Sequence, residues 1–214
     1  MPTLIYIADP MCSWCYGFGP ELDALLEGLP GLPVEVVVGG LRAFNTTAMD
    51  DAMRDELMTH WEQVHATSGL TMLDNAVNQP GFIYDTEPAC RAVVTARTVS
   101  QDAALPVFHA IQQAFYAEGR DVTRGDILAE VACAALVKMG VQQTVDNFLT
   151  LWSSTQMREA TLDDFKLTKS WEVDGFPMLI LERNGQLDMV TSGFARTTAL
   201  VDQLQLLVDN SSQS

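Results

Sequence analysis

The sequence has few of the residues that disulfide frameworks, metal sites and polyanion-binding surfaces require. Among 214 residues there are four cysteines and three histidines, and 12 Lys and Arg stand against 28 Asp and Glu, which gives a formal net charge of −16. Four cysteines in a chain of this length are too few for a disulfide-stapled scaffold. An acidic surface repels nucleic-acid phosphates and anionic lipids, so we expect neither nucleic acid nor a membrane as partner.

Long apolar runs are also lacking. No segment approaches the roughly 20 apolar residues that a membrane-spanning helix needs. The first ten residues contain no Lys or Arg, and the apolar run Leu4–Ala8 is too short for the centre of a signal peptide. We therefore expect a cytoplasmic protein. With 48% hydrophobic and 19% charged residues, the chain can form one domain, or one domain with a sizeable insertion.

The cysteines and histidines do not combine into a metal site. Cys12 and Cys15 form a C-x-x-C pair, but Cys90 and Cys133 stand alone, and no histidine is spaced as a partner for the pair. A structural zinc site needs about four ligands, so we predict no metal. We expect Cys90 and Cys133 to be buried thiols in helices, with a second, regulatory disulfide as the alternative.

Strands are predicted only near the two ends of the chain. Apolar runs at Thr3–Ala8 and Val34–Val38 predict buried strands, joined by a helix over Ser13–Gly28. Met178–Leu181 and Leu187–Thr191 predict a hairpin with an Asn-Gly turn between its strands. A closing helix over Arg196–Val208 and a frayed tail over Asp209–Ser214 follow.

The middle of the chain reads as helical throughout, with no convincing strand. Six helical segments are predicted: Met49–Thr67, one that starts at Thr86–Pro88 and continues over Ala89–Val99, Leu105–Tyr116, one from a capping box at Thr123 to Met139, Val141–Trp152 and Thr161–Trp171. The order predicts an α/β thioredoxin fold with a large all-helical insertion, because the first strands can form a right-handed βαβ unit that the hairpin extends. Residues 1–45 and 172–214 would form the thioredoxin-fold domain, and 46–171 the inserted helical subdomain.

Cys12 and Cys15 lie where the first strand passes into the first helix. Residues three apart share one face of a helix, so their Cα separation suits a disulfide. At the helix N-terminus, free N–H groups and the helix dipole would stabilise the Cys12 thiolate, while Cys15 would be more buried and act as the resolving thiol. Half a zinc site or two inert thiols are the alternatives, and the lack of a second ligand pair favours redox function.

The active-site string resembles a known family. Ala8-Asp-Pro-Met-Cys12-Ser-Trp-Cys15-Tyr-Gly-Phe-Gly-Pro20 is similar to the corresponding region of the DsbA-like branch of thioredoxin-fold proteins, above all of bacterial members without a signal peptide that are described as protein disulfide isomerases. Pro20 stands where such proteins often kink the helix. The segments around Cys90 and over Gln113–Tyr116 also look like this branch, which places a long helical domain between the second strand and the hairpin.

A second stretch, Val173-Asp-Gly-Phe-Pro177, precedes the third strand. The resemblance implies that Pro177 is a cis-proline beside the dithiol, and that Phe176 presents its backbone N–H and C=O to an extended client. The alternative is a trans proline at the start of a strand. The implied substrate-binding residues are Ser13, Trp14, Phe176 and Pro177, with Trp14 exposed.

The chain departs from this family at two places. Tyr6 stands where many relatives carry a buried carboxylate that helps to move the proton of the resolving thiol; Asp9 is near and could act through a water. The Ser13-Trp14 pair lacks the histidine of the strongly oxidising relatives, so a mid-range reduction potential is expected. Met11 and Met178 could add an apolar client surface or simply pack, and Arg91 is expected to pair with a carboxylate.

The leading hypothesis is a protein disulfide reductase or isomerase that uses Cys12 as nucleophile and Cys15 as resolving thiol. Clients would be disulfide-bearing proteins or small thiols, with no cofactor beyond the dithiol, although glutathione could be a co-substrate; the oligomeric state stays open. A reducing cytoplasm favours reduction or isomerisation over net oxidation. The alternatives are a glutathione-dependent enzyme of the kappa transferase or hydroxychromene carboxylate isomerase type, which usually has serine in place of Cys12, and a redox-switched binding module.

Overall fold

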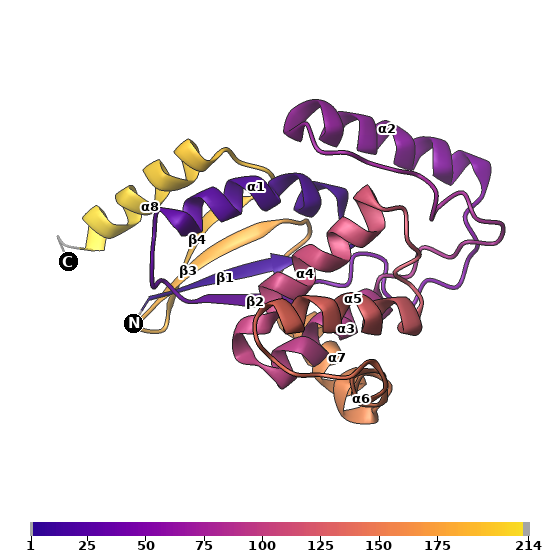
Figure 1. The fold of residues 1–214 in the computed structure, drawn as a ribbon. Coiled ribbons are helices and arrows are strands. Elements are labelled where there is room, and N and C mark those ends of the chain that lie inside the picture. Colours follow the sequence, from indigo (N-terminus) through magenta and orange to yellow (C-terminus); the bar gives the residue numbers. More distant parts are fainter. Residues whose placement is uncertain (1, 212–214) are drawn as a thin grey trace.

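A single four-stranded mixed sheet organises the computed structural model, which describes residues 2–211, with side chains up to residue 207 (Figure 1). The strands are β1 (Thr3–Ala8), β2 (Val34–Val38), β3 (Met178–Arg183) and β4 (Gln186–Ser192), in the order β2-β1-β3-β4. β1 and β2 are parallel and are joined by α1 (Ser13–Glu27), which confirms the predicted strand–helix–strand unit. β3 is antiparallel to both β1 and β4, so the hairpin extends the sheet as predicted.

The remaining helices lie between β2 and β3 or after β4. They are α2 (Asp51–Ser68), α3 (Glu87–Val99), α4 (Ala104–Gln112), α5 (Gly125–Lys138), α6 (Val145–Trp152), α7 (Thr155–Ser170) and α8 (Thr197–Ser211). A 3₁₀ turn at Gln101–Ala103 precedes α4, and a π-helical turn at Gln113–Ala117 follows it. The chain therefore has the predicted thioredoxin fold with a helical insertion.

Both faces of the sheet are covered. Side chains alternate along β1, so Leu4 and Tyr6 join a large core with residues of α1, α3, α4, α5 and α8. Ile5 and Ile7 face the other way and pack near Leu167 of α7. In Figure 1, α1 and α8 lie on one side of the sheet and α7 on the other. The insertion helices thus share one core with the sheet.

A mostly buried ion pair covers the outer edge of β2. Arg97 of α3 and Asp164 of α7 approach to 2.8 Å between Nη2 and Oδ1. Asp164 accepts a hydrogen bond from the Val38 N–H at 3.0 Å, and Arg97 donates one to the Val36 carbonyl at 2.7 Å. Edge strands expose unpaired backbone groups, and this pair satisfies two of them. It also fastens two insertion helices to the sheet.

The predicted capping box at the start of α5 is wrong. The helix begins at Gly125, and its N-cap, Arg124, makes no side-chain cap bond. The Thr123 hydroxyl donates to Asp121 at 2.6 Å, and Asp126 pairs with Arg124 at 2.6 Å. Both residues of the expected box are therefore engaged by neighbours in the preceding turn.

The boundaries of the next two helices also differ from the prediction. α6 begins at Val145 rather than at Val141, because the Thr144 side chain accepts from a backbone N–H at 3.2 Å and caps it. α7 begins at Thr155, well before Thr161, with Ser154 as its cap. At the other end of the chain, α8 continues to Ser211, past the predicted start of the frayed tail, and residues 212–214 lie outside the described residues.

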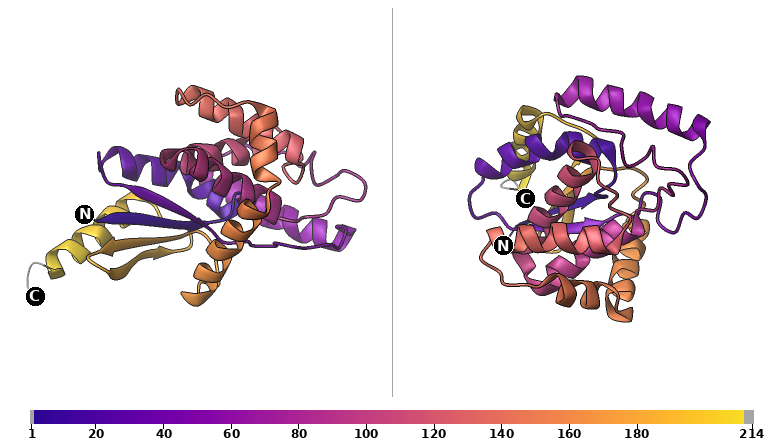
Figure 2. Two further views of the ribbon diagram at one scale, coloured as in Figure 1. Left: turned by 90° about the horizontal axis from the view of Figure 1, so that it is seen from below. Right: turned by 45° about the vertical axis from the view of Figure 1, so that its right-hand side comes forward.

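The start of β1 and the last turn of α8 lie at the same end of the sheet (Figure 2). The other end, where β1 leads into α1, therefore stands clear of both. Cys12, just before α1, lies at this second end.

Candidate active site

The two cysteines of the C-x-x-C pair occupy different environments. Cys12 is the N-cap of α1, with φ −86° and ψ 120°, and its amide donates to the Asp9 carbonyl at 3.0 Å. Its exposure is 6%, whereas Cys15 is fully buried one turn into the helix. The N-cap position places the Cys12 thiol beside the free N–H groups of the first turn. Both cysteines are free thiols, so the structure describes the reduced dithiol.

Burial raises the pKa of the Cys15 thiol well above its usual value, and the adjacent Cys12 thiol raises it further. A buried thiol of this kind keeps its proton at neutral pH. The Tyr6 hydroxyl, also fully buried, donates to the Cys15 carbonyl at 3.4 Å. Burial, together with the two nearby thiols, raises the pKa of Tyr6 well above its usual value, so position 6 holds a neutral phenol rather than a carboxylate.

Phe176 lies on the far side of Cys12. The Cys12 thiol donates to the Phe176 carbonyl, with 3.8 Å between sulfur and oxygen. The Phe176–Pro177 peptide bond is cis, the isomer that the resemblance implied. The ring of Phe176 rests on Gly39, where a β-carbon would lie 2.0 Å from the ring. The structure therefore brings the loop before β3 and the end of β2 together at the dithiol.

The other residues expected to bind a client are partly covered. Ser13 and Trp14 are half-buried. The expectation that Trp14 is exposed is wrong, because its ring packs 5.8 Å from the ring of Phe194 in the loop after β4. Met11 is fully buried and so packs rather than forming a client surface, while Met178 is half-buried.

Asp9 is a fully buried carboxylate three residues before Cys12. Its oxygens accept hydrogen bonds from the Met11 N–H at 2.8 Å, the Leu41 N–H at 2.7 Å and the Cys90 thiol at 3.4 Å. Burial raises the pKa of Asp9, and these hydrogen bonds oppose that rise. After burial, the charge of Asp9 is a further cause of the raised pKa of Cys90, and it adds to that of Cys15. A carboxylate thus acts electrostatically on the Cys15 thiol from a position other than residue 6.

The predictions for Cys90, Cys133 and Arg91 are confirmed. Cys90 and Cys133 are buried free thiols in α3 and α5. Arg91 pairs with Glu87, with 2.9 Å between Nε and Oε1, and its guanidinium lies 3.9 Å from the centre of the Trp152 ring. Arg91 is therefore a packing and ion-pair residue.

Two tyrosines that the sequence did not single out converge on Met11. The hydroxyls of Tyr84 and Tyr116 both donate to the Met11 carbonyl, Tyr116 at 2.6 Å. Both side chains are buried and come from the segment between β2 and β3. Tyr116 belongs to a stretch that resembled the family, but no local pattern could link it to a residue 105 positions earlier.

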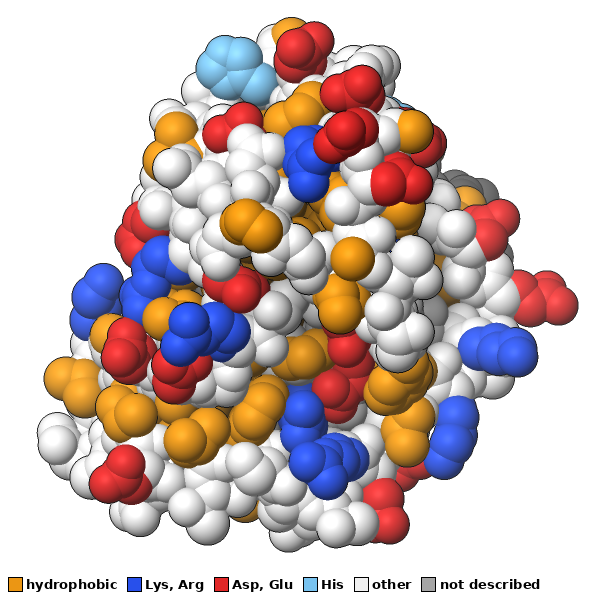
Figure 3. Space-filling model, turned by 90° about the vertical axis from the view of Figure 1, so that its right-hand side faces the viewer, with side chains coloured by type: hydrophobic (Ala, Val, Ile, Leu, Met, Phe, Trp, Pro, Cys, Tyr) orange, Lys and Arg blue, Asp and Glu red, His pale blue; other side chains and the backbone are white. Residues whose placement is uncertain are grey.

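The surface beside the dithiol is apolar in part. Figure 3 views the end of the molecule toward which β1 points, and hydrophobic side chains form an irregular band across its lower half, bordered by Lys and Arg. Leu41 and Phe44, in the loop after β2, are exposed, and the Phe44 ring packs edge-on against Phe165 at 6.2 Å. This loop also contains Gly39, which supports Phe176.

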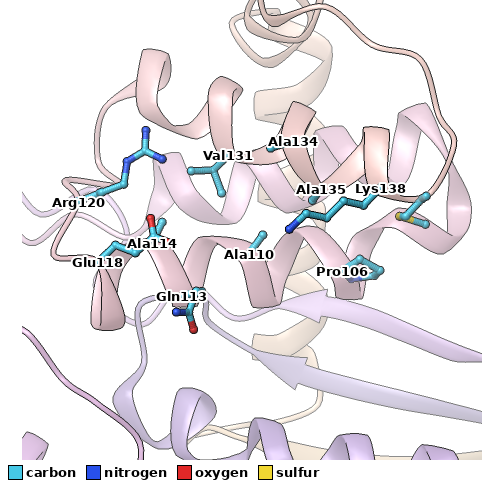
Figure 4. A pocket seen from close by; sticks show the side chains of 11 residues that line it. Pro106, Ala110, Gln113, Ala114, Glu118, Arg120, Val131, Ala134, Ala135 and Lys138 are labelled. Atoms are coloured by element: carbon cyan, nitrogen blue, oxygen red, sulfur yellow. The ribbon is translucent and has the colours of Figure 1, made fainter.

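A separate hollow lies between α4 and α5, with a volume of about 390 Å³ (Figure 4). Alanine side chains form much of its lining. Arg120, from the segment before α5, and Lys138, the last residue of α5, also line it. Arg120 is already paired with Glu130 at 2.7 Å. None of the residues that the sequence predicted for the active site lines this hollow.

Two further properties of residues 2–211 bear on the site. Within them, no group of three or more His, Cys, Asp or Glu side chains is arranged to hold a metal ion. None of the described helices combines the length and apolar character needed to cross a membrane.

Comparisons with solved structures give the same architecture. A protein from Nitrosomonas europaea, provisionally described as a protein disulfide isomerase, is 34% identical with a TM-score of 0.87, over 98% of each chain. The cytosolic disulfide reductase DsbM from Pseudomonas aeruginosa is 24% identical with a TM-score of 0.76, over 99% of this chain and 100% of its own, and it has also been solved with GSH. A 2-hydroxychromene-2-carboxylate isomerase is 15% identical with a TM-score of 0.66, over 99% of each chain.

The sequence was also compared with family models and with curated proteins. No curated protein matches it significantly. The model of the DSBA-like thioredoxin domain matches residues 3–205, nearly the whole chain. With the thioredoxin sheet, the helical insertion and the C-x-x-C pair at the start of α1, this match shows that the chain belongs to the DSBA-like thioredoxin domain family.

Proposed function

We propose that the protein is a thiol–disulfide oxidoreductase that reduces or isomerises disulfides, with Cys12 as nucleophile and Cys15 as resolving thiol. The observation that carries the proposal is the difference between the two thiols. Cys12 occupies the N-cap position of α1 and contacts the Phe176 carbonyl, whereas Cys15 is fully buried with a raised pKa. The two sulfurs of one motif are thereby suited to successive steps of one reaction.

The reaction balances in two exchanges. The Cys12 thiolate attacks one sulfur of a client disulfide, the S–S bond breaks, and the second client sulfur leaves as a thiolate that takes up a proton. Cys15 then loses its proton and attacks the sulfur of Cys12, which releases the first client sulfur and leaves a Cys12–Cys15 disulfide. Two electrons have passed to the client. In isomerisation, a client thiol instead attacks the mixed disulfide and Cys12 leaves reduced.

Backbone pairing at Phe176 is the proposed mode of client binding. An extended peptide can pair with the N–H and C=O of a residue at the open end of a strand. Phe176 lies next to Cys12, with Pro177 leading into β3, and Ser13 and Trp14 lie beside the nucleophile on α1. The exposed Leu41 and Phe44 add apolar surface nearby. This arrangement suits clients that differ in sequence.

Glutathione is the proposed reductant, and the cytoplasm the proposed location. Two glutathione molecules would return the Cys12–Cys15 disulfide to the dithiol and leave as glutathione disulfide. The similar DsbM is described as a cytosolic disulfide reductase and was solved with GSH, which supports both proposals. In a reducing compartment, reduction and isomerisation are the favoured directions.

Insulin reduction tests the proposal. The wild type should accelerate precipitation of reduced insulin with glutathione or dithiothreitol, Cys12→Ser should lose this activity, and Cys133→Ser should keep it. Cys15→Ser should accumulate a mixed disulfide on Cys12 that mass spectrometry detects. Full activity in Cys12→Ser, or no turnover by the wild type with either reductant, would refute the proposal.

A further inference from the structure

The carbonyl that precedes the Cys12 peptide nitrogen accepts two phenol hydroxyls. Tyr116 donates to the Met11 oxygen at 2.6 Å, and Tyr84 donates to the same oxygen. A carbonyl oxygen has two lone pairs, so these two donors saturate it. The amide of Met11 is held too, by the Asp9 carboxylate at 2.8 Å. Both peptide groups of the residue before the nucleophile are therefore fixed by buried side chains.

The local structure around Tyr84 and Tyr116 holds their hydroxyls in place. Tyr116 belongs to the π-helical turn that follows α4, a rare geometry that is frequent at functional sites. Its ring is held by stacking on Tyr16, 4.7 Å between centres, and by the edge of Trp61 at 5.0 Å. Tyr84 stands just before α3, with the guanidinium of Arg42 5.5 Å from its ring centre. Both hydroxyls therefore belong to buried side chains whose rings are held by packing.

The two hydroxyls also belong to the electrostatic surroundings of Cys12. Burial is the main cause that raises the pKa of both tyrosines, and charge on Cys12 raises it further. They are therefore neutral donors within electrostatic reach of the nucleophile. Without them, the partial negative charge of the Met11 oxygen would lie uncompensated in a buried position on the peptide that precedes Cys12, where unpaired polar groups act strongly.

We propose that Tyr84 and Tyr116 are positioning residues, which hold the Met11–Cys12 peptide and stabilise the Cys12 thiolate through the Met11 carbonyl. This inference rests on the proposed function, because it assigns the reactivity of Cys12 partly to the insertion. The other titratable groups that act on this neighbourhood are Asp9 and Tyr6 at the end of β1, Cys15 on α1, Arg42 beside Tyr84, and Cys90 against Asp9. They are unchanged in the variants below.

The test is the pH profile of iodoacetamide alkylation at Cys12, read by mass spectrometry, in Tyr84→Phe, Tyr116→Phe and the double variant. Phenylalanine keeps the ring and removes only the hydroxyl. Each single variant should be alkylated about threefold more slowly than the wild type at a pH below its midpoint, and the double variant about tenfold, with the profile displaced to higher pH. Tyr16→Phe is the matched control, since its hydroxyl donates to the Thr71 carbonyl and not to Met11. Its profile should overlay that of the wild type.

A purely structural role predicts a different result. The variants would then unfold at lower urea concentration while their alkylation profiles at Cys12 stay on the wild-type curve, and the inference would be overturned. If the double variant does not fold, the single variants decide, because each keeps one donor on the carbonyl. A wild type inactive on insulin would refute the proposed function, yet the alkylation profiles would still test the role of the two tyrosines.

Discussion

Gly39 lies directly against the ring of Phe176, and a β-carbon at position 39 would come within 2.0 Å of that ring. The carbonyl of the same residue, Phe176, accepts the hydrogen bond of the Cys12 thiol. A shift of the Phe176 ring would therefore also move the carbonyl that Cys12 contacts. The end of β2 therefore helps to set the distance between the Cys12 sulfur and the Phe176 carbonyl. Glycine is needed here for close approach.

Gly39→Ala should consequently lower kcat/KM for insulin reduction about tenfold, because Phe176 must move and small misplacements near a reacting group are costly. Gly175→Ala is the matched control: it adds the same methyl group next to Phe176, where no heavy atom lies within 4 Å. Equal activities of the two variants would show that the contact between Gly39 and Phe176 is unimportant for turnover.

Asp9→Asn should slow the release of client from the mixed disulfide about tenfold, more than it slows the first attack by Cys12. The proton of Cys15 must leave during release, and Asp9 is a buried carboxylate that can accept it. The charge of Asp9 by itself raises the pKa of Cys15, so slower release in Asp9→Asn would report a lost proton acceptor, and faster release a lost charge. Asparagine retains an oxygen that can accept from the Met11 N–H, which Asp9 now binds at 2.8 Å. Quenched single-turnover reactions analysed by mass spectrometry separate the two steps, and parallel slowing of both would count against a role in proton transfer.

The reduced protein should lose stability as pH rises above about 8.5, the usual pKa of an unfolded cysteine. Burial raises the pKa of Cys15 and of Cys90 well above their usual values, so both stay protonated in the fold while the unfolded chain ionises. Their contribution is complete below the unfolded pKa and is lost as pH increases, by up to about 1.4 kcal/mol per pH unit for each thiol.

Urea unfolding between about pH 7 and pH 9.5, with a phosphine reductant, measures this decline. Cys90→Ala removes one of the two thiols and should give a shallower curve, even if it is less stable at neutral pH. Cys133→Ala should flatten the curve less, because burial raises the pKa of Cys133 to a smaller extent. Parallel curves for the wild type and Cys90→Ala would contradict the explanation.

Asp164→Ala should cost about 2–4 kcal/mol of unfolding free energy, because it leaves Arg97 without its partner and the Val38 N–H without its acceptor. The control is Asp163→Ala on the same helix, whose pair with Lys166 is about 70% exposed. That change should stay within about 0.5 kcal/mol. Urea unfolding at one pH compares them, and equal losses would mean that the edge of β2 is not held in this way.

Local patterns predicted the position of the dithiol but not its surroundings. The spacing of Cys12 and Cys15 at the end of an apolar run is a short-range signal, and the structure places both as that signal requires. The contact of Tyr116 with Met11 joins residues 105 apart through a π-helical turn, which propensity does not reveal. Trp14 shows the same limit, because its burial depends on Phe194, a residue from the opposite end of the chain.

Helix starts were missed for a related reason. Thr123 and Asp126 have the spacing of a capping box, yet the Thr123 side chain bonds to Asp121 and the Asp126 side chain pairs with Arg124. Thr144 and Ser154 do cap helices, but neither precedes a strongly apolar turn. Periodicity alone therefore places the start of α6 too early and the start of α7 too late. In each case the hydrogen bonds of polar side chains near the first turn, and not the apolar pattern, determined where the helix begins.

The separation between Cys12 and the ends of the fold has a practical consequence. The first residues of β1 and the last turn of α8 lie together at the far end of the sheet from the dithiol (Figure 2). A tether joined to either place would attach the molecule at the end of the sheet opposite Cys12, so the end that contains Cys12 would face the solvent. If the Cys15→Ser variant is immobilised on a resin in this orientation, bulky folded clients can still reach the end of the molecule that contains Cys12.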